Sequence, residues 1–189
     1  MPYVKNQGLR LYYQVEGEGP PLILQHGFGD TLKSWYELGY IEALKDEHRL
    51  ILIDARGHGA SDKPHEPEAY SFPNVTTDVV AVLDDLSISK AHYFGFSMGG
   101  KNGFVLAAYA PERLRSLIVL GTGASAQAHA PLDLWIASLR QGPEAVPSMW
   151  ETDARLSPAL RQRLLSNDLE ALSVPREKRR WDSTIFCLL

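Results

Sequence analysis

Short apolar runs alternate with helical patterns through the first 120 residues of the chain. Most of the runs are continuous, which is typical of strands buried on both faces of a parallel sheet. The first of them is aromatic and partly alternating, and it also predicts a strand. The predicted strands are residues 9–15, 22–25, 50–54, 93–96 and 117–120.

Between these runs, apolar residues largely recur at steps of three and four. Three segments show this spacing, residues 32–45, 75–86 and 98–109, and Pro111 follows the last of them as a stop signal. Strands that alternate with amphipathic helices predict a three-layer α/β fold, with a mostly parallel sheet and right-handed crossovers.

The alternation of strand and helix patterns ends after Gly121. The next segment has helical patterns and no clear strand, with the best candidates at 132–139, 158–165 and 175–181. We interpret residues 1–124 as the core, residues 125–182 as a helical lid, and residues 183–189 as the start of a further core strand.

Composition and charge narrow the class of protein. The 189 residues are 44% hydrophobic and 22% charged, as in a globular chain, and no apolar run approaches the roughly 18 residues of a spanning helix. Residues 1–7 lack the apolar stretch of a secretion signal, so we expect a cytoplasmic protein without a membrane partner. The single cysteine, Cys187, excludes an internal disulfide and a multi-cysteine zinc site. The net charge of -4 argues against a nucleic-acid partner, and we expect no metal or cofactor.

The sequence Gly-x-Ser-x-Gly at residues 95–99 lies directly after a predicted strand and directly before a predicted helix. A serine on such a tight turn needs small neighbours, so that the backbone can turn and the hydroxyl stays exposed. The helix adds a positive N-terminus beneath a developing oxyanion. This context favours Ser97 as a nucleophile over a structural turn serine.

A second glycine-rich loop, HGFGD at residues 26–30, follows the predicted strand 22–25. Such a loop can aim backbone N–H groups into the crevice at the carboxyl ends of the strands. The N–H groups of Phe28 and Met98 could together hold an acyl oxyanion. For His26 we prefer a structural role, in which its ring fixes the loop by hydrogen bonding, over the role of a general base.

The segment DARGHGASD at residues 54–62 contains Asp54 and His58, which could be proposed as members of a catalytic triad. We prefer a structural interpretation, in which the glycines form the turn and the charged groups brace one another.

Four motifs follow one another along the chain: HGFGD at 26–30, DARGHGASDKP at 54–64, GFSMGG at 95–100 and APERLRSLIVLGTGA at 110–124. Together they resemble the α/β-hydrolase family. Within it they are most similar to the serine esterase and lactonase branch, which includes the 3-oxoadipate enol-lactonases and the acyl-homoserine-lactone-degrading esterases.

The resemblance implies that Ser97 is the nucleophile and that the N–H groups of Phe28 and Met98 form the oxyanion hole. It implies a small-molecule ester or lactone as substrate. Family members with an aspartate nucleophile, the dehalogenases and epoxide hydrolases, are disfavoured because position 97 is serine.

In this family a serine is followed along the chain by an acid and then by a histidine. Residues 184–189 look like the beginning of the strand that precedes the acid, and residues 121–123, the alternative acid position, hold Gly-Thr-Gly. The one histidine after Ser97 is His129, which we expect to be a surface or pocket residue. We therefore expect the acid, the histidine and the last strands to be missing from these residues. The uncovered apolar strand, 117–120 or 184–189, would then favour self-association through a sheet edge.

Two functions remain open at this point. The first is a serine hydrolase of carboxylic esters or lactones that forms an acyl-enzyme at Ser97. The second is a non-catalytic protein that binds a small hydrophobic ligand on the same fold. In either case Trp135, in the predicted lid, is the first candidate to line an apolar pocket. An equal alternative is that Trp135 only packs the lid on the core.

Overall fold

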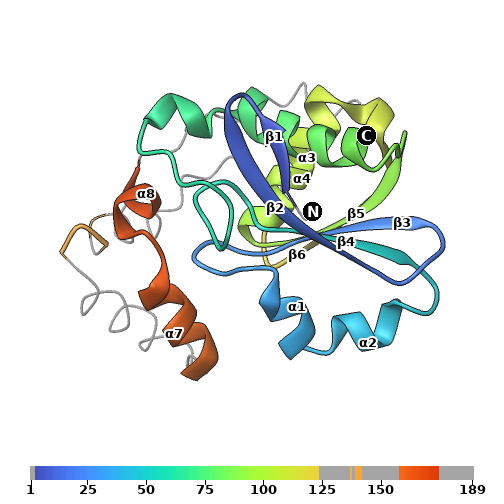
Figure 1. Ribbon diagram of the computed structural model, residues 1–189, viewed down its shortest axis with the longest axis horizontal. Coiled ribbons are helices and arrows are strands. Elements are labelled where there is room, and N and C mark those ends of the chain that lie inside the picture. Colours follow the sequence, from blue (N-terminus) through green and yellow to red (C-terminus); the bar gives the residue numbers. More distant parts are fainter. Residues whose placement is uncertain (1–2, 124–136, 138, 142–157, 175–189) are drawn as a thin grey trace.

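The computed structural model describes residues 3–123, 137, 139–141 and 158–174 (Figure 1). Trp135, His129 and the predicted strand at 183–189 lie outside the described residues. The division into core, lid and further strand therefore stays a prediction.

A six-stranded sheet forms the centre of the described part, in the order β1-β2-β4-β3-β5-β6. The strands are β1 (Tyr3–Asn6), β2 (Leu9–Glu16), β3 (Pro21–Gln25), β4 (Arg49–Ile53), β5 (Ala91–Phe96) and β6 (Leu114–Leu120). The four strands β4, β3, β5 and β6 are parallel to one another, whereas β2 pairs antiparallel with both β1 and β4. The predicted, mostly parallel sheet is confirmed.

Helices cover both faces of this sheet, as the three-layer prediction requires (Figure 1). The helices are α1 (Lys33–Glu37), α2 (Tyr40–Leu44), α3 (Phe72–Asp85), α4 (Met98–Tyr109), α7 (Pro158–Ser166) and α8 (Leu169–Ser173), with short 3-10 turns η1 (Pro67–Tyr70) and η2 (Pro111–Arg113). Helices α1 and α2 pack on one face and α3 and α4 on the other, while α7 and α8 lie to one side of the sheet.

The predicted single helix at residues 32–45 is wrong in one respect. The structure divides it into α1 and α2 at Gly39, which has a φ of 78°. That left-handed conformation costs glycine little, and it ends one helix and begins the next.

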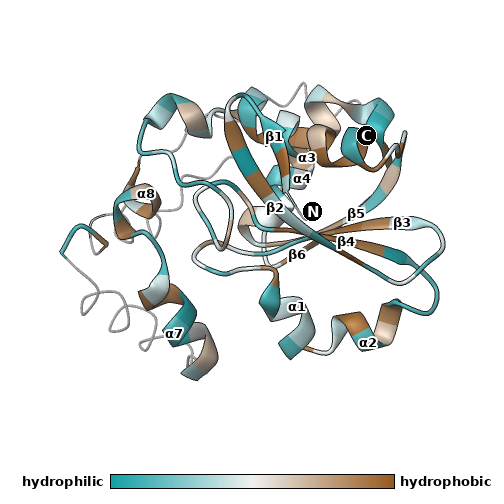
Figure 2. Ribbon diagram, in the orientation of Figure 1, coloured by the Kyte–Doolittle hydropathy of each residue, from teal (hydrophilic) through white to brown (hydrophobic). Residues whose placement is uncertain are grey.

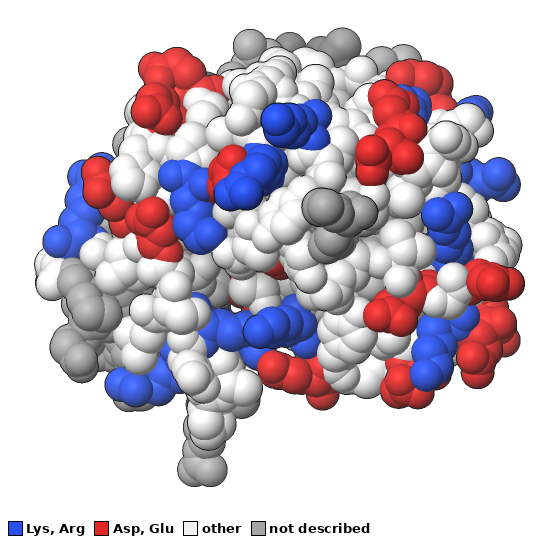
Figure 3. Space-filling model, in the orientation of Figure 1, with Lys and Arg blue, Asp and Glu red and all other residues white. Residues whose placement is uncertain are grey.

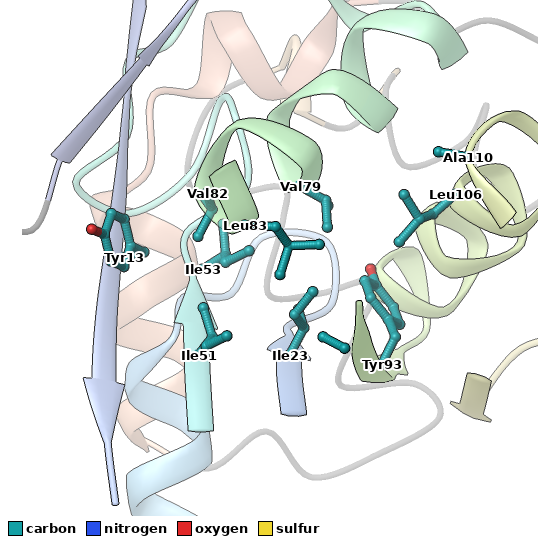
Figure 4. Close-up of a cluster of buried hydrophobic side chains, with 11 residues drawn as sticks. Tyr13, Ile23, Ile51, Ile53, Val79, Val82, Leu83, Tyr93, Leu106 and Ala110 are labelled. Carbon is teal, nitrogen blue, oxygen red and sulfur yellow. The ribbon is translucent and has the colours of Figure 1, made fainter. Parts of the chain in front are cut away.

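Alternate residues of the central strands supply two separate apolar cores. Figure 4 shows Ile23, Ile51 and Ile53 directed toward α3, where Val79 and Leu83 meet them. The second core lies on the other face of the sheet. The strands contribute Leu22, Leu24, Leu50 and Leu52 to it, and helices α1 and α2 contribute Trp35 and Ile41. Burial on both faces explains why these strands are continuously apolar in sequence, and Figure 2 shows this hydrophobic centre in brown.

Strand β6 lies at one edge of the described sheet. Two of its apolar side chains, Ile118 and Leu120, are 51% and 47% exposed. Residues 117–120 are one of the two edges that the sequence predicts, and the other, 184–189, lies outside the described residues. Association through either edge stays a prediction. In the part of the chain that the structure describes, no helix has the length and apolar character to cross a membrane.

Candidate active site

Ser97 lies at the junction of β5 and α4, in a backbone conformation that few residues adopt. Its φ is 49° and its ψ is -107°, and its N–H donates to the Leu120 carbonyl oxygen over 2.8 Å. A non-glycine residue in such a region costs on the order of 1–3 kcal/mol and persists only where the surrounding structure imposes it. The structure therefore has the tight strand-to-helix turn that the sequence predicts.

Two glycines make this turn possible because backbone atoms approach them closely. A Cβ at Gly95 would lie 2.3 Å from the Gly99 carbonyl oxygen, and a Cβ at Gly99 would lie 2.1 Å from the Gln25 carbonyl oxygen. Neither contact can be relieved by moving a flexible side chain. The first glycine lets α4 turn tightly away from β5, and the second lets α4 pack against the end of β3.

Tyr93, which the sequence analysis did not single out, supports the turn from below. Its hydroxyl lies 2.5 Å from Gln25 Oε1 and 2.9 Å from the Gly99 carbonyl oxygen. Burial raises the pKa of the Tyr93 phenol well above its ordinary value, so the group is a neutral donor. The side chain links β5, β3 and the first turn of α4 beneath Ser97.

The loop at residues 26–30 runs beside Ser97. A Cβ at Gly27 would lie 3.6 Å from Ser97 Cβ, and Met98 is the first residue of α4. The Asp30 N–H donates to the Gly27 carbonyl oxygen over 3.3 Å and closes a turn around Phe28. The structure thus brings together the two segments in which the sequence predicts the oxyanion donors. That the N–H groups of Phe28 and Met98 bind an oxyanion stays a prediction.

His26 has the structural role expected for it. Its Nε2 accepts a hydrogen bond from the Ala55 N–H over 3.1 Å, so the proton lies on Nδ1, which donates to the Gly27 carbonyl oxygen over 2.8 Å. The ring is fully buried. Both ring nitrogens are hydrogen-bonded to backbone groups, so His26 is unsuited to act as a general base.

Asp54 and Arg56 of segment 54–62 are also structural, but the structure does not pair them with each other as the sequence predicts. Asp54 accepts hydrogen bonds from the N–H groups of Leu32 and Ala60, each over 2.8 Å. Arg56 instead forms a buried two-point ion pair with Asp78 of α3, over 2.5 and 2.6 Å. The segment is therefore fastened to two other elements of the fold.

A cavity of about 260 Å³ adjoins the loop and the carboxyl end of β5. Its lining includes the apolar residues Trp35, Phe96 and Leu120 and the charged residues Asp30, Glu37 and Arg163. A wider hollow of about 580 Å³ lies near Ile88 and Lys90, at the amino end of β5. Because ligands of open α/β sheets bind at the carboxyl ends of the strands, the smaller cavity is the candidate site.

Figure 3 shows acidic and basic side chains interspersed over one face of the molecule, without a continuous basic patch. Within the described ranges, no cluster of three or more histidine, cysteine, aspartate or glutamate side chains could hold a metal ion.

A family model described as the alpha/beta hydrolase fold matches residues 20–185. The chain belongs to the α/β-hydrolase family. Its membership confirms the fold and the resemblance that the four motifs indicate.

Known members of the family show which branches this α/β hydrolase is similar to. Over 120 residues it is 39% identical to 3-oxoadipate enol-lactonase 2 of Acinetobacter baylyi, covering 62% of this chain and 43% of that protein. Over 119 residues it is 36% identical to mouse epoxide hydrolase 4, covering 62% of this chain and 33% of that protein. The solved structure of Est816, described as an N-acyl homoserine lactone degrading enzyme, aligns with a TM-score of 0.64 and 28% identity, covering 90% of this chain and 69% of that one.

The chain thus spans less than half the length of the two curated relatives. The α/β-hydrolase fold and a hydrolase relationship follow from these similarities. The nucleophile, the substrate and the activity of the whole protein are matters for proposal.

Proposed function

We propose that this α/β hydrolase acts on carboxylic esters or lactones through an acyl-enzyme at Ser97. The observation that carries the proposal is the position of Ser97, on a strained turn at the N-terminus of α4 with the loop 26–30 beside it. That arrangement keeps a hydroxyl at the carboxyl edge of the sheet, next to backbone N–H groups and a helix N-terminus.

The residue at position 97 favours this chemistry over epoxide opening. Relatives of both kinds are similar to the chain, so similarity alone does not separate the two reactions. A serine hydroxyl attacks an acyl carbon to give an ester that water can hydrolyse. An enzyme that opens epoxides through a carboxylate nucleophile would need an aspartate where this chain has Ser97.

In the proposed reaction, Ser97 Oγ attacks the substrate carbonyl carbon as its proton passes to a base. The carbonyl oxygen becomes an oxyanion, to which the N–H groups of Phe28 and Met98 donate. Collapse of the intermediate breaks the bond to the alcohol oxygen, which takes the proton from the base, and leaves an acyl-serine. The alcohol departs from an ester, whereas in an opened lactone it stays on the acyl chain. Water then attacks the acyl-serine as its proton passes to the base, and the proton returns to Ser97 Oγ as the carboxylic acid is released.

We propose that the acid and the histidine of this mechanism lie outside the 189 residues. The residues after Ser97 that the structure describes include no histidine, and His129, which follows Ser97 in the sequence, lies outside the described residues. A serine without its base is a weak nucleophile, although an oxyanion hole and substrate binding alone leave rates roughly 10³-fold above water. We therefore expect weak turnover from this chain.

The same gap supports a second candidate, a binding protein that holds a small hydrophobic ligand in the cavity beside Gly27. Hydrolysis of p-nitrophenyl esters and of acyl lactones should separate the two functions, with Ser97→Ala as the control. Turnover that Ser97→Ala abolishes supports the hydrolase. Equal binding of an ester by both proteins, measured by calorimetry and without turnover by either, supports the binding protein.

We further propose that Trp135 lines the acyl pocket. Trp135→Ala should then change the preference for acyl-chain length more than it changes the melting temperature. Equal losses on all substrates together with a lower melting temperature would favour a packing role.

A further inference from the structure

Helix α7 is fastened directly to the loop beside Ser97 by an ion-pair network. Arg163 Nε lies 2.7 Å from Asp30 Oδ1, and Arg163 Nη1 lies 2.5 Å from both carboxylate oxygens of Glu37. The Arg163 and Asp30 side chains are only 13% and 15% exposed, so water screens this contact less than it screens a surface ion pair. One guanidinium therefore joins α7, the loop and α1.

Asn167, directly after the end of α7, holds the loop backbone itself. Asn167 Nδ2 lies 2.7 Å from the Gly29 carbonyl oxygen and 2.8 Å from the Arg163 carbonyl oxygen. Leu164, which is buried, packs so closely that a Cβ at Gly29 would lie 2.3 Å from its Cδ2. Helix α7 and the residue that follows it thus contact the loop through a charged, an apolar and a polar side chain.

The loop needs such support because its backbone has little preference of its own. Glycine stands on both sides of Phe28, and Gly29 has a φ of 73°. The Phe28 side chain also packs against the cluster of Leu139 and Leu172. Hydrogen bonds from His26 and the Asp30 N–H to the Gly27 carbonyl orient the peptide that carries the Phe28 N–H. Contacts from residues far along the chain hold Gly29, Asp30 and the Phe28 side chain, and so hold the position of the loop as a whole.

We propose that Arg163 is a positioning residue for the reaction at Ser97, which holds the oxyanion loop in place by docking α7 on Asp30 and Glu37. The inference rests on the proposed function, because it is the Phe28 N–H whose position matters. Donors of an oxyanion hole act over a narrow range of distance, and a displacement of about 1 Å can lower the rate on the order of 10²-fold. Docking of α7 and stabilisation of the oxyanion are then coupled.

The chemistry of the side chain explains why an arginine stands at this position. A guanidinium presents several N–H donors in a planar fork, so one group can bind two carboxylates from different elements. Without it, Asp30 and Glu37 would face each other as like charges beside the loop. A lysine could supply the charge but not the two directed contacts.

The test compares Arg163→Gln and Arg163→Lys with Gln162→Ala, a change at an exposed position of the same helix. Two quantities are measured on each protein: amide hydrogen exchange at residues 28–30, and the second-order rate of Ser97 labelling by a fluorophosphonate. The labelling reaction also needs the oxyanion hole, because it develops charge on a phosphoryl oxygen. Exchange in β3 and β5 shows whether the core remains folded.

Arg163→Gln should increase exchange at residues 28–30 and slow labelling at least 10-fold, whereas β3 and β5 keep their protection. Arg163→Lys should fall between this variant and the parent, and Gln162→Ala should match the parent. Faster exchange with unchanged labelling, or unchanged exchange, would overturn the proposal. A parent protein that is never labelled would instead refute the proposed function, and exchange at residues 28–30 would still decide whether Arg163 holds the loop.

Discussion

Replacing Gly99 by alanine should destabilise the chain by about 2 kcal/mol. The added Cβ would lie 2.1 Å from the Gln25 carbonyl oxygen and 2.8 Å from that of His26, so α4 and β3 must separate by at least 0.9 Å to restore a 3.0 Å contact. Overpacking costs about 1–3 kcal/mol, and a contact with the backbone of a central strand should lie at the upper end of that range. The better helix propensity of alanine returns up to about 1 kcal/mol.

Urea denaturation followed by circular dichroism measures this difference, with Asn102→Ala on the same helix as the control. The Asn102 side chain makes no hydrogen bond to the described residues, so the control gains helix propensity and should be as stable as the parent or more stable. Gly99→Ala should unfold about 4–8 °C below the parent in a thermal scan. A Gly99→Ala protein as stable as the control would refute the idea that close packing on β3 requires this glycine.

Two further predictions concern charged pairs. Arg56→Met leaves the Asp78 carboxylate buried without its partner, so it should lower the free energy of unfolding by about 3 kcal/mol, and adding Asp78→Leu should recover much of the loss. If the single and double variants are equally stable, this ion pair is not what holds segment 54–62 to α3. The hydrogen bond to Asp168 raises the pKa of His65 above its ordinary value of 6.5, with a smaller contribution from Glu170. The pair therefore stabilises the fold fully below pH 6.5 and loses its effect as the pH rises through the raised value. An NMR titration should show this raised pKa in the parent and a lower pKa in Asp168→Asn, a variant that keeps an N-cap for α8. An unchanged pKa in the variant would contradict the assignment.

Local signals explain why α4 could be predicted from the sequence at both ends. Its start follows a Gly-x-Ser-x-Gly turn and its end precedes Pro111, and the structure places it at Met98–Tyr109 as predicted. Strand β1 was missed because it is short and its residues are not continuously apolar. It pairs with β2 across Gln7 and Gly8, whose φ angles of 50° and 85° fit a tight hairpin turn.

The site could be predicted only where the topology brings strand ends together. Strands β3 and β5 are neighbours, so the loop after one and the turn after the other meet at the same edge. The contact of Arg163 with Asp30 spans 133 residues and has no local signal, since the chain offers many arginines with similar surroundings in sequence. In sequence, Tyr93 is an ordinary residue of a predicted strand, because its partners, Gln25 and Gly99, are defined only by the fold.

The central claim is that Ser97 is the nucleophile, and covalent labelling tests it most directly. The chain is incubated with an excess of fluorophosphonate, and the modified residue is located by peptide mass spectrometry. Ser87→Ala is the matched control, because Ser87 is the other described serine with a positive φ, of 56°. We predict a single adduct on Ser97 that persists in Ser87→Ala and disappears in Ser97→Ala. An adduct on another residue, or the absence of any adduct on the parent chain, would contradict the account.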